Sequence, residues 1–242
     1  MKKAETTIKD LKEEINVILS HNNKAISPKI EAKINKMIKQ DMSRNIIISS
    51  IVNKYQQLNY TPSSVEGFIY QKIIETQDNK MIQELRNHLP EGLIQLDKST
   101  QINYQPLQEL LIKKNFQEAD ELTQKFLCRL VEEKTNNKKK WLYFTDIHFI
   151  TKNELFTIDL LWKIYSKGKF GFSIQKHIWI KQNKQWDKLW EKIKWQKAKT
   201  GIMKRYPQEF TWSIDAPEGH LPLFNQLRGT QTLAYLFQKI DW

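Results

Sequence analysis

The stretch SKGKFGFSIQKHIW, residues 166–179, places two phenylalanines around a glycine in a chain that has only seven glycines. Aromatic rings on a sheet can stack on bases, and the RNA-recognition strand has the pattern Lys/Arg-Gly-Phe/Tyr-Gly/Ala-Phe-Val-x-Phe/Tyr. Here Phe170 stands where the pattern requires glycine, and Gln175 or Lys176 replaces the last aromatic residue. A helical pattern precedes the stretch. A basic helical RNA-binding protein that uses the Phe170-Gly171-Phe172 stretch is therefore only the alternative function.

The sequence lacks the usual patterns for catalysis or metal binding. It has no Gly-x-Ser-x-Gly turn, no P-loop and no dinucleotide-binding glycine pattern. No two histidines have the i, i+4 spacing of a helical metal site. The histidines are His21, His88, His148, His177 and His220. The single cysteine, Cys128, excludes an internal disulfide, and its leucine neighbours predict a buried thiol. We expect no catalytic residue and no metal site, and the protein is not expected to be an enzyme.

The tryptophans indicate a different chemistry. All eight lie between Trp141 and Trp242. Trp162 and Trp179 stand in strongly apolar surroundings and are expected in the core. The number of tryptophans between Trp179 and Trp212 exceeds what packing of one small domain usually needs. An apolar cleft with a rim of lysine and arginine would suit a flat, hydrophobic ligand that carries carboxylates. The candidates for such ring contacts are Trp179, Trp186, Trp190 and Trp195.

The composition is that of a globular protein with a basic surface. The formal net charge is +12, and the basic residues are 34 lysines and 5 arginines. Such a bias, together with many Asn and Ile residues, is typical of an AT-rich genome, so the charge alone is a weak sign of nucleic-acid binding. The charged amino terminus lacks the pattern of a signal or transit peptide, and no apolar run has the ~20 residues of a membrane span.

The elements that must position these residues fall into two predicted domains. Residues 1–88 are expected to form a helical bundle, with a capping box at Ser63–Glu66 that opens its fourth helix. Residues 89–105 are the predicted linker. Residues 106–242 form the second domain, in which a capping box at Thr151–Glu154 opens a helix and a last helix runs from about Thr230 to Lys239. The sequence thus predicts a mainly α protein with long loops.

Three segments of the second domain resemble the genomes-uncoupled-four family, the porphyrin-binding accessory proteins of magnesium chelatase. They are LQELLIKKNFQEADELT (107–123), TIDLLWKIYSKGKFGFSIQKHIW (157–179) and FTWSIDAPEGHLPLFNQLRG (210–229). The resemblance covers about residues 104–242, and the chain is similar to the plastid-encoded members of the family. It implies a helical "cupped hand" domain that follows an N-terminal helical bundle.

The resemblance also implies a function. Members bind protoporphyrin IX or Mg-protoporphyrin IX without a covalent cofactor, and they stimulate the chelatase through its large porphyrin-binding subunit. The implied protein is a non-catalytic monomer of the plastid stroma that does not bind nucleic acid, and peripheral association with plastid membranes belongs to the same expectation. An enzyme that modifies a porphyrin is a third candidate.

Site residues follow from the same resemblance. The family's two loops correspond to about residues 138–153, here the first loop, and about residues 201–229, here the second loop. The sequence departs from the family at Lys194-Trp195-Gln196, where Gly-Trp is usual, and in its lysine-rich segment 183–205. In the first loop Phe149 is expected to line the palm. The implied porphyrin contacts outside the first loop are Trp195, Tyr206, Phe210, Leu221, Gln226 and Arg228, of which Arg228 is the expected partner of a propionate.

Overall fold

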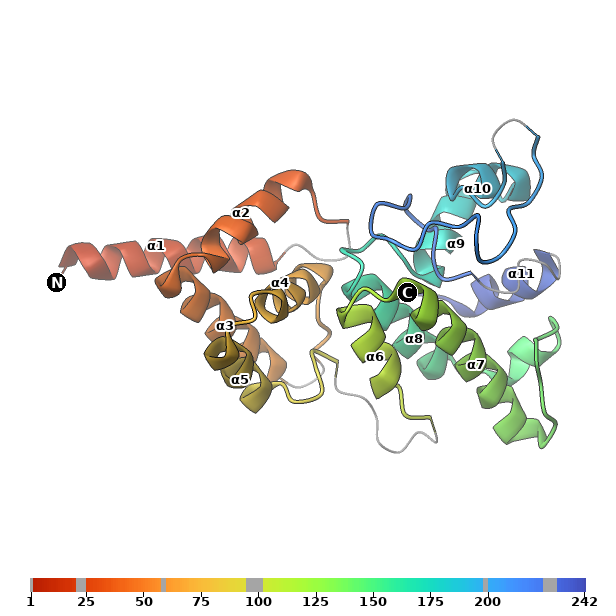
Figure 1. Cartoon of the computed structure of the whole chain (residues 1–242), viewed down its shortest axis with the longest axis horizontal. Helices are drawn as coiled ribbons and strands as arrows, with labels where there is room; N and C mark the ends of the chain where they lie inside the picture. Colours follow the sequence, from red (N-terminus) through yellow and green to blue (C-terminus); the bar gives the residue numbers. More distant parts are fainter. Residues whose placement is uncertain (1, 21–24, 58–59, 95–101, 198–199, 224–229) are drawn as a thin grey trace. The chain divides into compact units, whose positions relative to one another are not determined.

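The computed structural model of the chain describes residues 2–20, 25–57, 60–94, 102–197, 200–223 and 230–242. The chain divides into two compact units, Met1–Gln95 and Leu96–Trp242, and Figure 1 gives the helix labels used below. In these ranges the regular structure is helical, and the only extended pairing is an isolated antiparallel bridge between Gln196 and Met203. The prediction of a mainly α protein is confirmed. None of the described helices is long and apolar enough to cross a bilayer.

The described part of the first unit is a bundle of helices. They are α1 (Lys2–Leu19), α2 (Pro28–Ile38), α3 (Asp41–Tyr55), α4 (Ser64–Glu75) and α5 (Asn79–His88). The predicted capping box opens α4, because Ser63 Oγ accepts the Glu66 amide and Glu66 Oε2 accepts the Ser63 amide. Lys54 Nζ lies 3.3 Å from Glu66 Oε1 and donates to the Leu19 carbonyl. One buried carboxylate therefore links the start of α4 with α3 and the end of α1.

The second unit carries the aromatic residues. Its helices are α6 (Gln105–Ile112), α7 (Phe116–Thr135), the 3-10 turn η1 (Asp146–Phe149), α8 (Lys152–Ile164), α9 (Phe172–Lys181), α10 (Trp186–Lys192) and α11 (Thr230–Lys239). Trp162 is fully buried, stacks on Phe116 and donates from Nε1 to Thr123 Oγ1 over 3.0 Å. This bond and the ring stack hold α8 against α7. Thr151 and Glu154 form the predicted capping box of α8.

The Phe170-Gly171-Phe172 stretch belongs to the core. Both phenylalanine rings are fully buried, so neither can stack on a base in this structure. Gly171 precedes α9 with φ +134°, a value that L residues rarely adopt. A Cβ atom there would lie 2.8 Å from Asp159 Oδ1. The Gly171 amide donates to the Leu221 carbonyl over 3.0 Å, so the stretch holds the main chain of the second loop at Leu221.

Candidate functional site

Both long loops of the second unit are attached to α7. Near its start, Asp120 Oδ1 accepts the Leu223 amide at 2.5 Å, and the next residue, Glu121, accepts the Tyr206 hydroxyl at 3.4 Å. Near its end, Glu132 accepts the Lys139 amide of the first loop. A rise of about 1.5 Å per residue puts roughly 17 Å between Glu121 and Glu132. One helix therefore carries the second loop at one end and the first loop at the other.

A buried carboxylate shapes the first loop. Asp146 Oδ2 accepts the Tyr143 amide at 2.8 Å, while Asp146 Oδ1 lies 3.0 Å from Lys139 Nζ. Asp146 itself is 5% exposed. In this loop the carboxylate is buried and the aromatic side chains are exposed to solvent, whereas in most proteins charged groups are exposed and aromatic rings are buried. The exposed aromatic residues of this loop are Tyr143, Phe144 and Phe149.

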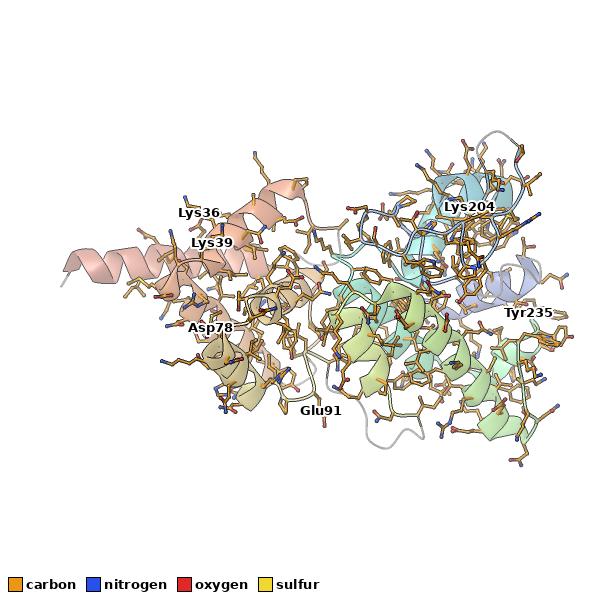
Figure 2. All side chains as sticks on the ribbon, in the orientation of Figure 1. Lys36, Lys39, Asp78, Glu91, Lys204 and Tyr235 are labelled. Carbon is orange, nitrogen blue, oxygen red and sulfur yellow. The ribbon has the colours of Figure 1, made fainter. Side chains whose placement is uncertain are left out.

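Phe149 occupies an outward position at the end of η1 and is 39% exposed. Lys134 Nζ donates to its carbonyl at 2.9 Å and also pairs with Glu154. Lys239 donates to the carbonyl of His148 at 2.9 Å. Nearby, the rings of Phe144 and Tyr235 have centroids 5.2 Å apart, and Figure 2 shows Tyr235 projecting from α11. The predicted palm residue is thus exposed, with its ring against that of His148 and its carbonyl bonded to Lys134.

A column of four tryptophan rings lies beneath the second loop. The centroids of Trp179 and Trp186 are 4.8 Å apart, those of Trp186 and Trp190 5.3 Å, and those of Trp190 and Trp195 5.1 Å. Trp195 is fully buried and donates from Nε1 to the His220 carbonyl at 2.8 Å. Trp179 is half-buried, with its ring centroid 5.6 Å from that of Phe237, so it lies at the edge of the core and not in its fully buried part. The Trp195 end of the column supports the second loop through its bond to the His220 carbonyl.

His220 joins the parts of the second loop. It is fully buried, with Nδ1 2.6 Å from the Ile193 carbonyl and Nε2 accepting the Thr211 amide at 3.1 Å. Burial lowers the pKa of His220 to about 4; the hydrogen bond to Ile193 opposes the change, and the charges of Lys204 and Lys194 add to it. The imidazole is therefore neutral at pH 7 and donates from Nδ1. Nothing in the histidine spacing marked this residue, because both its partners are backbone groups.

The other predicted residues of the second loop separate by exposure. Tyr206 is 37% exposed and packs edge-on against Trp212. Burial raises its pKa, and the charges of Asp120 and Glu121 raise it further. Phe210 is nearly buried between the rings of Trp212 and His220. Leu221 is fully buried, and its carbonyl accepts the Gly171 amide.

The structure thus brings Trp195, Phe210 and Leu221 together around His220. Tyr206 instead contacts Trp212 and Glu121, and Phe149 lies in the first loop. Gln226 and Arg228 lie outside the described residues. Within the described residues, no three His, Cys, Asp or Glu side chains gather as a metal site would require. The exposed groups of the two loops described above include aromatic rings with lysines nearby. Such a surface can bind a flat apolar ligand through its faces and anionic substituents through the ammonium groups.

Comparison with known proteins places this unit. The family model described as GUN4-like matches residues 97–240. The uncharacterized protein ycf53 of Pyropia yezoensis is 44% identical over 186 residues, which cover 76% of each chain. A tetrapyrrole-binding protein, chloroplastic, of Arabidopsis thaliana is 37% identical over 134 residues, 52% of this chain and 50% of that one. The structure of GUN4 from Chlamydomonas reinhardtii matches with a TM-score of 0.52 and 36% identity, over 60% of this chain and 91% of that chain.

Proposed function

The chain belongs to the GUN4-like family, and from this premise we propose that it is a tetrapyrrole-binding regulatory protein of a plastid. The observation that supports binding most directly is the pair of loops on α7, which present Phe149 and Tyr206 to solvent although both are aromatic. Exposed rings fixed by buried polar bonds are typical of a ligand site, because ordered exposure of apolar surface has no benefit for folding. The relative from Arabidopsis thaliana is named as tetrapyrrole-binding and chloroplastic, which supports both the ligand class and the compartment.

The proposed ligand is protoporphyrin IX or Mg-protoporphyrin IX, held without a covalent bond. Phe149 and Tyr206 would contact the ring faces, since both have free surface in this structure. Trp195, Phe210 and Leu221 would support the wall, because their side chains are buried. Gln226 and Arg228 stay predicted contacts, with Arg228 the partner of a propionate.

We further propose that the protein acts on the porphyrin-binding large subunit of magnesium chelatase and stimulates magnesium insertion into the bound ring. In this proposal it works as a monomer and catalyses no reaction itself. The plastid stroma is the proposed location, with peripheral association at plastid membranes. Adding the protein to a chelatase assay at limiting porphyrin should raise the initial rate, whereas an unchanged rate over a range of protein concentrations would contradict the regulatory part.

Binding is tested by titrating protoporphyrin IX with the full chain and following the absorbance and emission of the porphyrin itself. The wild-type protein should shift both spectra at micromolar concentrations. Phe149→Ala should raise the Kd about tenfold, because removal of a buried aromatic contact costs about 1–2 kcal/mol. Met42→Ala is the control, because Met42 is an exposed apolar residue of the first unit. Unchanged spectra with wild type would refute the proposal.

The alternative function is tested in parallel with single-stranded RNA. Phosphate contacts would make RNA affinity fall steeply with salt, while binding of a largely apolar ring should depend on salt only weakly. Because Phe170 and Phe172 are fully buried, we expect no salt-sensitive RNA complex. Steeply salt-dependent RNA binding together with unaltered porphyrin spectra would favour the RNA-binding alternative.

A further inference from the structure

Asp120 is a buried acid whose charge the described surroundings do not neutralise. It lies on α7, is 3% exposed, and accepts the Leu223 amide at Oδ1. No lysine or arginine pairs with it in the part of the chain that the structure describes. Buried carboxylates are costly unless they are paired or protonated. The folded protein therefore favours the protonated form of this carboxyl group.

The position of Asp120 on α7 suggests a role in holding the second loop. The bond to Leu223 joins residues 103 positions apart in the chain. The neighbouring Glu121 accepts the Tyr206 hydroxyl, so two successive residues of α7 hold the second loop at two places. Of these, the bond from Asp120 is short and buried, and the one from Glu121 is long and exposed. The attachment of the loop to α7 therefore depends mainly on Asp120, while Gln175 of α9 holds the same loop through the carbonyls of Gly219 and Pro222.

We propose that Asp120 is a positioning residue of the tetrapyrrole site, and that its carboxyl group latches the second loop onto α7 through the Leu223 amide. The ligand in this inference rests on the proposed function. The latch itself is a property of the ligand-free protein and can be measured without porphyrin. Asp120 acts through the loop that carries Tyr206 and does not need to touch the ligand.

Protonation controls such a latch. Burial raises the pKa of Asp120 well above its usual value; the Leu223 amide opposes this change, and the charge of Glu121 adds to it. Among the described groups, Tyr206 of the second loop also interacts with Asp120, because the charge of Asp120 raises the pKa of Tyr206. The closed state therefore favours the protonated carboxyl group, whereas in an open loop Asp120 would titrate nearer its ordinary pKa. Rising pH therefore favours the open loop, by up to tenfold per pH unit, until the closed-state pKa is reached.

Hydrogen exchange of the full chain without porphyrin tests the latch, read from the peptide that contains residues 217–223. Asp120→Ala should lower its protection factor at least tenfold, while Glu118→Gln, an exposed acid on the same helix, should leave it unchanged. Asp120→Asn keeps an acceptor oxygen but cannot ionise. The ratio of its protection factor to that of wild type should rise with pH above about pH 4, the ordinary pKa of an aspartate, and other titrating groups cancel in this ratio.

Equal exchange in Asp120→Ala and wild type, or a ratio that stays constant over this range, would overturn the latch. If Asp120→Ala fails to fold, the ratio alone decides. Protoporphyrin titration then separates the two proposals. A wild-type protein that leaves the spectra unchanged refutes the proposed function, and the exchange result still decides the latch. A loosened loop with unchanged porphyrin affinity refutes the positioning role alone.

Discussion

The buried His220 predicts a defined loss of stability in mild acid. Its pKa is about 4 in the folded protein and about 6.5 in an unfolded chain. Above pH 6.5 both states are neutral, and His220 adds no pH dependence. As the pH falls below 6.5 the unfolded state takes up a proton that the folded state refuses. At about 1.4 kcal/mol per pH unit, the free energy of unfolding should fall by about 3 kcal/mol between pH 6.5 and pH 4, then level off.

Urea unfolding followed by tryptophan fluorescence reports on the structural unit that contains His220, because all eight tryptophans lie in that unit, Leu96–Trp242. His220→Gln keeps donor and acceptor atoms but cannot take up a proton in this range. It should cost about 1–3 kcal/mol at pH 7 through imperfect hydrogen bonds. As the pH falls to 4, the free-energy difference should change by about 3 kcal/mol in favour of the variant, because only wild type loses stability through His220. Comparison with wild type cancels the other acids and bases.

His177→Gln is the matched control, because His177 is an exposed residue on α9 of the same unit. It should follow the wild-type profile at every pH. The reasoning is refuted if the free-energy difference between His220→Gln and wild type is the same at pH 7 and pH 4. Such a result would mean that the folded protein protonates His220 as readily as the unfolded chain does, against the two backbone bonds that the neutral ring makes.

Two further substitutions test the site and its scaffold. Arg228→Ala should weaken protoporphyrin binding about tenfold without loss of stability, since a charge-assisted bond to a propionate contributes about 1.5–3 kcal/mol; equal Kd values for variant and wild type would contradict the assignment. Gly171→Ala should lower the free energy of unfolding by about 2 kcal/mol or more, because the backbone is at φ +134° and the new Cβ would lie 2.8 Å from Asp159 Oδ1. Gly201→Ala, at φ +65° with nothing within 4 Å, should cost only about 1 kcal/mol, and equal urea midpoints for the two glycine variants would refute the clash.

Local signals in the sequence predicted the helices well. The capping boxes at Ser63 and Thr151 are both present, and α11 spans Thr230–Lys239 as expected. These features depend on residues three or four apart, where side-chain chemistry decides the backbone bond directly. The family resemblance added the expectation that two loops frame one site. The resemblance itself, stated for about residues 104–242, is confirmed by the family model, which matches residues 97–240.

The bonds that position the site could not be predicted in the same way. Asp120 reaches an amide 103 residues away, and His220 reaches a carbonyl 27 residues away. In each case the partner is a backbone group, which every residue carries, so no residue type marks it. The exposure of each aromatic residue was equally hidden. Trp195 and Phe149 both belong to the predicted contact set, yet one is fully buried and the other is 39% exposed.

This difference changes what the density of tryptophan means. Trp195 donates from Nε1 to the His220 carbonyl and stacks its ring on Trp190. Because its side chain is also fully buried, it cannot contact a ligand in this structure. The most exposed aromatic residues at the two loops are instead phenylalanine and tyrosine. Each loop main chain is held by a buried aspartate, Asp146 in one and Asp120 in the other. Ligand affinity should therefore respond more to the removal of one of these carboxylates than to conservative changes within the tryptophan column, because the carboxylates determine where the exposed rings stand.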